Sequence, residues 1–190
     1  MKTEADDLVK RIGRGEQIAA VDLIDLFYER IYAFLRRLCF NDADAADLTQ
    51  KTFAKVWQAL PGFNGRSSVG SWIHSIAYHT YVDWRRSSSA TEARSSEWWA
   101  DRICSDPLPD EIACRNELSV KTYTAVDQLA EELRNTIHLH YYQELTIQET
   151  ADAMGVATST VKYRVRQALR ELQQKVGTTG STKHLSSQII

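Results

Sequence analysis

Residues 146–170 carry the pattern that most restricts the fold, because they read as two helices joined by a tight turn. Thr146 and Glu149 form a Ser/Thr-x-x-Glu capping box, which is the signature of a helix start. Gly155 then supplies the left-handed residue at which many helices end. A second helix is expected from about Thr158, whose hydroxyl we predict to cap it. The pattern predicts a helix-turn-helix.

The second of these helices has one apolar and one basic face. Its apolar residues recur at three- and four-residue spacing, and they are Val161, Val165, Ala168 and Leu172. From Thr158 to Arg170 there are four basic residues and no acidic one, although the whole chain has a net charge of −2. A helical hairpin with a solvated charged face has the same outline. The local absence of acids and the small polar residues at the helix tip favour DNA binding over that reading.

Composition limits where and how such a chain works. With 190 residues and a net charge of −2, it has no general basic coat, so any attraction to nucleic acid must be local. No apolar run is long enough to span a bilayer, and the first residues do not resemble a signal peptide. The three cysteines, Cys39, Cys104 and Cys114, form no CxxC pair or even framework. We therefore expect a cytoplasmic protein without direct membrane insertion.

Helical periodicity dominates the remaining sequence, and no strand pattern is convincing. The predicted fold is all-α, with two small helical domains joined by a flexible acidic linker, the second domain containing the helix-turn-helix. Prolines and serines mark the linker, and glycine, threonine and serine mark the C-terminal tail, which we expect to be disordered. The predicted boundaries are 1–86 for the first domain, 87–111 for the linker, 112–176 for the second domain and 177–190 for the tail.

Two further motifs connect this outline to a known family. Residues 44–57, Asp-Ala-Ala-Asp-Leu-Thr-Gln-Lys-Thr-Phe-Ala-Lys-Val-Trp, resemble the polymerase-binding helix of extracytoplasmic-function (ECF) sigma factors of the sigma-70 family. Residues 72–86, which begin Trp-Ile-His-Ser-Ile-Ala and end Asp-Trp-Arg-Arg, resemble the promoter-melting helix of that family. The helix-turn-helix is similar to its second DNA-binding domain. The three motifs occur in the family's order and cover roughly residues 5–86 and 112–175.

The resemblance implies a bacterial alternative sigma factor. Such a factor binds core RNA polymerase and promoter DNA, directs promoter-specific transcription initiation, and is controlled by an anti-sigma factor. The sequence itself contains no glycine-rich phosphate loop, nucleophile elbow or paired-carboxylate arrangement, so we expect no enzymatic activity and no cofactor, metal or small-molecule substrate. The resemblance places it in the bacterial cytoplasm, held at the inner membrane face where its anti-sigma factor is membrane-bound. It does not identify the promoter, the inducing signal or the anti-sigma factor.

The motifs also imply which residues act. Contacts with duplex DNA at the −35 element are expected from the second helix of the helix-turn-helix, through Thr158, Ser159, Thr160, Lys162, Tyr163, Arg164 and Arg166. Contacts with the −10 element during melting are expected from Asn64, Arg66, His79, Arg85 and Arg86. Core polymerase is expected to contact the helix over 43–60 through a polar stripe formed by Asp44, Asp47, Gln50 and Lys51. The aromatic neighbours of this stripe, Phe53 and Trp57, are expected to join the contact and to lie partly in the core.

Some positions depart from the family's pattern. Ala46 and Lys51 stand where acids are usual, and His79 stands where asparagine is usual, so the polymerase and melting contacts of this chain are altered there. Two other readings therefore remain open. A plain helix-turn-helix regulator would bind DNA without recruiting polymerase, and a sequestering protein would bind partners without driving transcription. Substituting Asp47 and Gln50 separates the first of these from a sigma factor.

The histidines and cysteines raise the possibility of a metal site. His138 and His140, together with Cys104 and Cys114, supply suitable ligand types. Helical positions two residues apart do not face one another, so a structural role is favoured for the two histidines. Whether any of the three cysteines has a redox or metal role stays open at this point.

Overall fold

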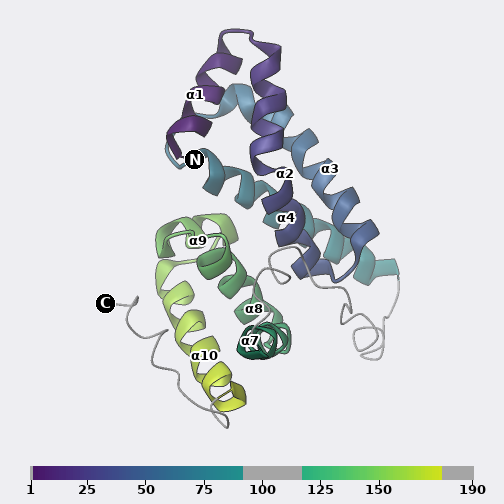
Figure 1. The fold of residues 1–190 in the computed structure, drawn as a ribbon, viewed down its shortest axis with the longest axis vertical. Helices are drawn as coiled ribbons and strands as arrows, with labels where there is room; N and C mark the ends of the chain where they lie inside the picture. Colours follow the sequence, from purple (N-terminus) through teal and green to yellow (C-terminus); the bar gives the residue numbers. More distant parts are fainter. Residues whose placement is uncertain (1, 92–116, 177–190) are drawn as a thin grey trace.

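The computed structural model describes residues 2–91 and 117–176, and both ranges are built from helices (Figure 1). Within these ranges there is no strand, which confirms the predicted all-α fold. Most of the expected linker and the whole expected tail lie outside the described residues. No helix in the described part of the chain is long and apolar enough to cross a membrane.

The N-terminal domain is organised around one long central helix. This helix, α2, contacts all three other helices of the domain. The elements are α1 (Lys2–Gly13), α2 (Gln17–Cys39), α3 (Asp42–Ala59), the short 3-10 helix η1 (Leu60–Gly62) and α4 (Val69–Thr91). Helix α4 continues to Thr91, past the expected linker start at residue 87, because serine weakens a helix but does not break it as proline does.

The C-terminal domain consists of shorter helices. Helix α10 packs against α7, α8 and α9, as Figure 1 shows in yellow-green. The elements are α7 (Glu117–Asp127), α8 (Glu131–Ile137), the π-helical segment η2 (His138–Tyr142), α9 (Ile147–Met154) and α10 (Thr158–Val176). Helices α9 and α10 with their short connection form the predicted helix-turn-helix.

Local hydrogen bonds explain where α9 begins and ends. The Glu149 N–H donates to Thr146 Oγ1 at 3.2 Å, and the Thr146 N–H donates to Glu149 Oε2 at 3.0 Å, which confirms the capping box. Gly155 ends the helix with φ +65°, as expected. The predicted cap of α10 is wrong by one residue. Thr158 is already its first helical residue, and Ala157, which has no side-chain oxygen, precedes it.

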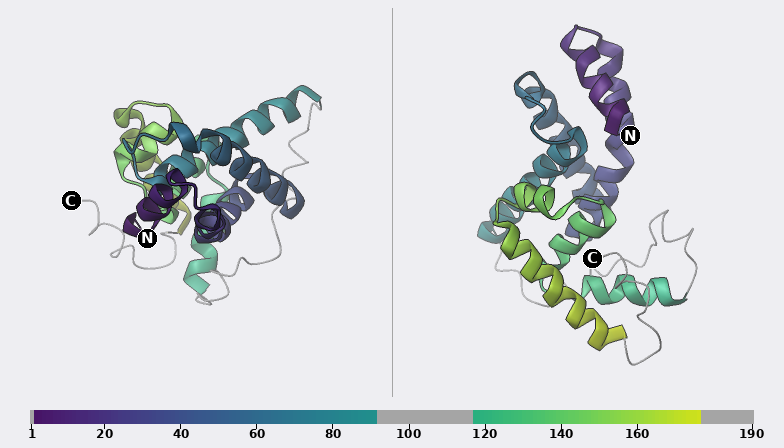
Figure 2. Two further views of the ribbon diagram at one scale, coloured as in Figure 1. Left: turned by 90° about the horizontal axis from the view of Figure 1, so that it is seen from above. Right: turned by 90° about the vertical axis from the view of Figure 1, so that its left-hand side faces the viewer.

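The two domains lie side by side, and one apolar cluster spans both, in addition to the clusters inside the C-terminal domain. Helix α4 packs against α9, and the two views of Figure 2 show this arrangement. Buried residues of the C-terminal domain join the core of α2, α3 and α4, and they are Leu139, Leu145, Ala153 and Met154. We call the contact of α2 and α4 with α8, α9 and residues 143–145 the domain interface.

Candidate nucleic-acid and polymerase interfaces

Helix α10 presents its polar residues to solvent and its apolar residues to the core. Val161, Val165 and Ala168 are buried, as the sequence pattern predicts. The predicted DNA-contacting residues on the opposite face are exposed, namely Ser159, Lys162, Tyr163 and Arg166. Tyr163 is 59% exposed, so its ring and hydroxyl are accessible on this face.

Three other predicted DNA contacts are less accessible. Thr158, Thr160 and Arg164 are half-buried. Arg164 lies near enough to Tyr78 of α4 for its charge to lower the pKa of that phenol, against the larger effect of burial, which raises it. In this arrangement Arg164 is therefore partly withdrawn from the surface that the other residues form.

The predicted polymerase-binding stripe lies on the outer face of α3. Asp47, Gln50 and Lys51 are exposed, Asp44 is half-buried, and Trp57 is 54% exposed. The Lys51 ammonium contacts the Asp47 carboxylate at 2.6 Å, so the lysine that departs from the family's pattern neutralises a predicted contact residue. Phe53 differs from the rest of the stripe. Its ring is buried and stacks on Tyr28, with ring centroids 6.2 Å apart, so Phe53 packs in the core.

The predicted melting residues are distributed over the loop before α4 and over α4 itself. Asn64 and Arg66 are exposed, and the Arg66 N–H donates to Asn64 Oδ1 at 3.1 Å, across Gly65 with φ +71°. The rings of Phe63 and Trp72, 4.9 Å apart, anchor this loop to α4. His79 and Arg86 are exposed on α4.

Arg85 is placed differently from Arg86. Its guanidinium donates to the Tyr81 hydroxyl at 3.2 Å and pairs with Glu131 of α8 at 2.8 Å. The Tyr81 hydroxyl itself donates to Glu131 at 2.9 Å. The structure therefore places this predicted phosphate contact at the domain interface, in an ion pair with the other domain.

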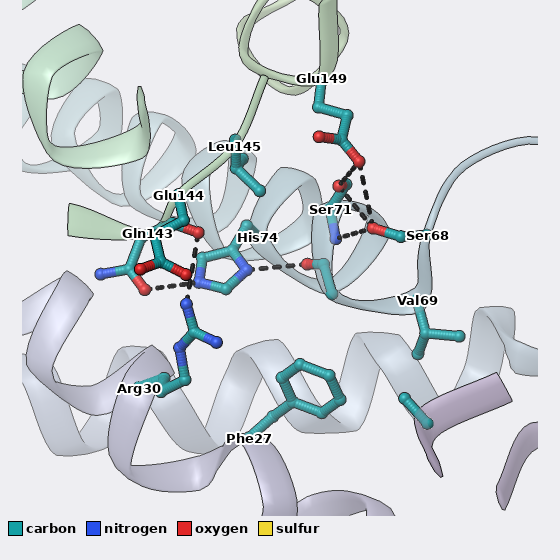
Figure 3. A pocket seen from close by; sticks show the side chains of 12 residues that line it. Phe27, Arg30, Ser68, Val69, Ser71, His74, Gln143, Glu144, Leu145 and Glu149 are labelled. Carbon is teal, nitrogen blue, oxygen red and sulfur yellow. Dashed lines mark hydrogen bonds between the residues drawn. The ribbon is translucent and has the colours of Figure 1, made fainter. Parts of the chain in front are cut away.

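A cavity of about 330 Å³ opens at the domain interface (Figure 3). On one side, His74 Nε2 lies 3.0 Å from Gln143 Oε1, and Arg30 donates to the Gln143 carbonyl at 3.2 Å. On the other side, Glu149 accepts hydrogen bonds from Ser71 at 2.6 Å and from Ser68 at 3.3 Å. Sequence reasoning missed these contacts. The only available signal was His74, a polar residue on the buried face of an amphipathic helix.

Burial and hydrogen bonding shift the pKa values of His74 and Glu149. Burial lowers the pKa of His74 to about 4, although its hydrogen bonds to Gly70 and Gln143 act against this. Partial burial raises the pKa of Glu149, but hydrogen bonds from Ser71, Thr146 and Ser68 outweigh it and lower that pKa to about 2. Near pH 7 the imidazole is therefore neutral and the carboxylate ionised.

The cysteines and the remaining histidines show no convergent site in the described residues. Cys39 is buried, and burial raises the pKa of its thiol to about 11, which disfavours the reactive thiolate. Cys104 and Cys114 lie outside the described residues. His138 packs on Tyr142, whereas His140 Nδ1 lies 2.6 Å from the Leu145 carbonyl. Among the described residues, no three metal-ligating side chains come together.

A helical domain with an exposed charged stripe, followed by a helix-turn-helix with an outward polar face, defines a two-domain transcription factor of the DNA-binding class. The Sigma-70 region 2 family matches residues 23–91, and the Sigma-70, region 4 family matches residues 119–172. The chain is 31% identical to the ECF RNA polymerase sigma factor SigX of Bacillus subtilis (strain 168) over 156 residues, which cover 80% of each chain. It belongs to the ECF sigma factors of the sigma-70 family.

Other relatives agree with this assignment. The ECF RNA polymerase sigma factor SigK of Mycolicibacterium vanbaalenii is 27% identical over 179 residues, covering 92% of this chain and 90% of that protein. The fold resembles the sigma factor RpoE of Bartonella quintana, solved with the anti-sigma factor NepR, with a TM-score of 0.65, 21% identity, and coverage of 83% and 96%. It also resembles CnrH, solved with the cytosolic domain of CnrY, with a TM-score of 0.66, 20% identity, and coverage of 93% and 99%. The predicted sigma factor is thereby confirmed over the plain regulator.

Proposed function

We propose that the two domains divide the work of initiation in this chain. The N-terminal domain binds core RNA polymerase through α3 and opens the −10 element. The C-terminal domain reads the −35 element as duplex DNA through α10. The observation that carries this proposal is the outward face of α10, where Ser159, Lys162, Tyr163 and Arg166 are all exposed beside a buried apolar stripe.

The chemistry of this face suits a major groove. Arginine donates two parallel hydrogen bonds to a guanine edge, and lysine and serine hold phosphates or base edges. Of the arginines in the expected set, Arg166 is exposed, whereas Arg164 is half-buried. We therefore assign the main base contact to Arg166, with Arg164 joining it once α10 is free of α4.

The exposed stripe of α3 suits a helical partner. Charged and amide side chains alternate there with an exposed indole, Trp57, and such a mixture of a polar rim and an aromatic anchor is typical of protein interfaces. Asp44, Asp47, Gln50 and Lys51 supply the polar contacts. Phe53 supports the stripe from beneath by its stack on Tyr28.

Melting needs a site for an unstacked base and cations for the phosphates. The loop of Asn64 and Arg66 supplies the first, and Arg85 and Arg86 supply the second, with His79 between them on α4. No catalytic step by the factor itself is part of this proposal, since the chemistry of RNA synthesis belongs to the polymerase.

Regulation by an anti-sigma factor is part of the proposal. Two proteins of similar fold were solved with a bound partner, which is the anti-sigma factor NepR in one case and the cytosolic domain of CnrY in the other. We propose that an anti-sigma factor holds this chain inactive in the cytoplasm or at the inner membrane face. Co-purification from the native bacterium, with and without inducing stress, tests this point.

Run-off transcription tests the central function. Purified bacterial core polymerase is incubated with a pool of promoter-length genomic fragments, with and without this protein. We expect new discrete transcripts whose templates share two upstream sequence elements. A sequestering protein would instead bind polymerase and yield no transcript.

Substitutions on α3 separate polymerase binding from DNA binding. The pair Asp47→Asn and Gln50→Ala is expected to weaken binding to core polymerase by about tenfold or more, because truncated polar contacts leave their buried partners unpaired. The matched control is Asp7→Asn with Gln17→Ala, which changes exposed residues of α1 and α2. Equal polymerase affinity of the two pairs, measured by fluorescence anisotropy, would remove α3 from the interface.

Substitutions on α10 test the DNA assignment. Arg166→Ala is expected to weaken binding to the selected −35 duplex by roughly tenfold to a hundredfold, because one bidentate base contact contributes about 1–3 kcal/mol. Arg170→Ala is the matched control, since Arg170 is exposed one turn further from the helix tip. If both variants lose the same DNA affinity at fixed salt, Arg166 contributes only its charge and makes no specific base contact. Polymerase binding is expected to stay unchanged in both variants.

A further inference from the structure

The domain interface is held by specific polar contacts in addition to its apolar core. Three C-terminal side chains carry most of them: Glu131 contacts Tyr81 and Arg85, Gln143 contacts His74, and Glu149 contacts Ser71 and Ser68. Tyr81, His74 and Ser71 are buried, at 0%, 1% and 4% exposure. Each N-terminal partner belongs to α4 or to the residues just before it, so one helix is fastened to the other domain along much of its length.

These contacts engage groups that the proposed function needs elsewhere. Arg85 is assigned to phosphates of the melted strand, but here it pairs with Glu131 at 2.8 Å. Ser68 ends the loop that presents Asn64 and Arg66, and here it contacts Glu149 of the helix-turn-helix at 3.3 Å. Arg164 of the recognition helix is half-buried toward Tyr78 of α4. The Glu131 contact therefore withdraws Arg85 from the melting surface, and Arg164 is withdrawn from the exposed face of α10.

The distance between the two DNA elements leads to the same conclusion. Elements at −35 and −10 lie about two turns of duplex apart, roughly 70 Å at about 35 Å per turn. In the structure α4 and α9 are packed together, with Ser71 and Glu149 joined by a 2.6 Å hydrogen bond. A molecule in this arrangement does not reach both elements at once, so the domains must separate before a promoter is bound.

We propose that this arrangement is a self-inhibited closed state of the factor, in which Glu131, Gln143 and Glu149 latch the helix-turn-helix domain onto α4 until core polymerase draws the domains apart. The proposal rests on the proposed function. Because only the open state binds polymerase productively, the apparent affinity for polymerase is reduced by the fraction of molecules that are open. Weakening the latch therefore increases that affinity without changing any contact with polymerase.

The test compares two full-length variants, each of which replaces one tyrosine by phenylalanine and one glutamate by glutamine. The latch variant carries Tyr81→Phe and Glu131→Gln, which keep both shapes and remove the hydroxyl donor and the charge. The control carries Tyr28→Phe and Glu132→Gln, on α2 and in the same turn of α8, where both residues are exposed. None of the four positions is assigned to DNA or polymerase. Circular dichroism verifies that both variants remain helical, and Tyr81→Phe alone serves if the double variant unfolds.

Small-angle scattering and polymerase titration give the two readouts. We expect the latch variant to have a larger radius of gyration than the control and about tenfold tighter apparent binding to core polymerase, as a tenfold rise in the open fraction requires. Equal radii, or equal affinities despite different radii, would overturn the self-inhibited state. If neither variant nor the parent protein binds polymerase, the proposed function fails instead. Scattering then still shows whether the free protein is closed, because that measurement does not require polymerase.

Discussion

At the scale of single residues, Glu149 has two structural roles. Its carboxylate completes the capping box with Thr146 and accepts the Ser71 hydroxyl from the other domain. Replacing the charge by an amide weakens charge-assisted hydrogen bonds but keeps the shape. We expect Glu149→Gln to lower the free energy of unfolding at pH 7 by about 1 kcal/mol, the usual contribution of a helix cap. Urea denaturation measures this, with exposed Glu29→Gln on α2 as the control.

The pH dependence of that effect has a definite sign. The pKa of Glu149 is lowered from 4.5 to about 2 in the folded protein. A carboxyl group with a lowered pKa stabilises the fold above pH 4.5, and this contribution is lost as pH falls from 4.5 toward 2. The difference in the free energy of unfolding between the parent protein and Glu149→Gln should therefore shrink as pH falls from 4.5 toward 2. A constant difference down to pH 2.5 would show that the charge of Glu149 contributes nothing.

Local residue roles were predictable, and distant ones were not. The capping box followed from the sequence because its two partners are three residues apart. The Ser71 partner of Glu149 is 78 residues away and follows no local pattern. Phe53 and Trp57 show how far spacing goes. From the sequence, both are expected to lie partly in the core, but only the fold shows that Phe53 is buried under the ring of Tyr28 while Trp57 stays 54% exposed.

At the scale of elements, the turn of the helix-turn-helix depends on Gly155. Its φ of +65° is a conformation that side chains with a Cβ atom disfavour, and an added Cβ would meet no atom within 4 Å. The expected cost of Gly155→Ala is therefore backbone strain alone, about 1–2 kcal/mol. Gly155→Asn should cost less, because asparagine tolerates this region. Thermal unfolding of the three proteins checks the order, and an equal loss for both variants would point to a steric cause.

Element types were predictable from periodicity, whereas some of their ends were not. The apolar stripe of α10 is buried as its spacing indicates. The π-helical segment at His138–Tyr142 was not predicted, because it depends on tertiary contacts. The Gln143 N–H donates to the His138 carbonyl five residues back, and the Gln143 side chain contacts His74 of the other domain. Wider turns of this kind often coincide with functional contacts.

At the scale of the whole molecule, motif order predicted two domains but not their packing. Each domain has its own amphipathic helices, and local periodicity does not distinguish a face that covers its own core from one that meets another domain. Contacts such as Tyr81 with Glu131, 50 residues apart, become visible only in three dimensions. The closed arrangement is thus the part of the function that the sequence did not reveal.

The same packing makes the closed molecule sensitive to acid. Burial lowers the pKa of His74 to about 4, with Arg30 contributing and the bonds to Gly70 and Gln143 opposing. Burial, Arg37 and Arg134 lower the pKa of His138 to about 3. A histidine with a lowered pKa stabilises the closed fold above pH 6.5, and this contribution is lost as pH falls below 6.5. At pH 5.5 each histidine therefore costs about 1.4 kcal/mol.

We expect His138→Phe to remove about half of this acid sensitivity, because its Nε2 has no hydrogen-bond partner to lose and a phenyl ring does not titrate. Urea denaturation at pH 7.5 and 5.5 measures the change, with exposed His79→Phe as the control. The parent and the control should lose the same amount of stability between pH 7.5 and pH 5.5. The loss for His138→Phe should be smaller by about 1.4 kcal/mol. If the parent is equally stable at both pH values, neither histidine is held neutral by closure. Scattering at pH 5.5 then separates domain opening, with helicity intact, from unfolding of the whole chain.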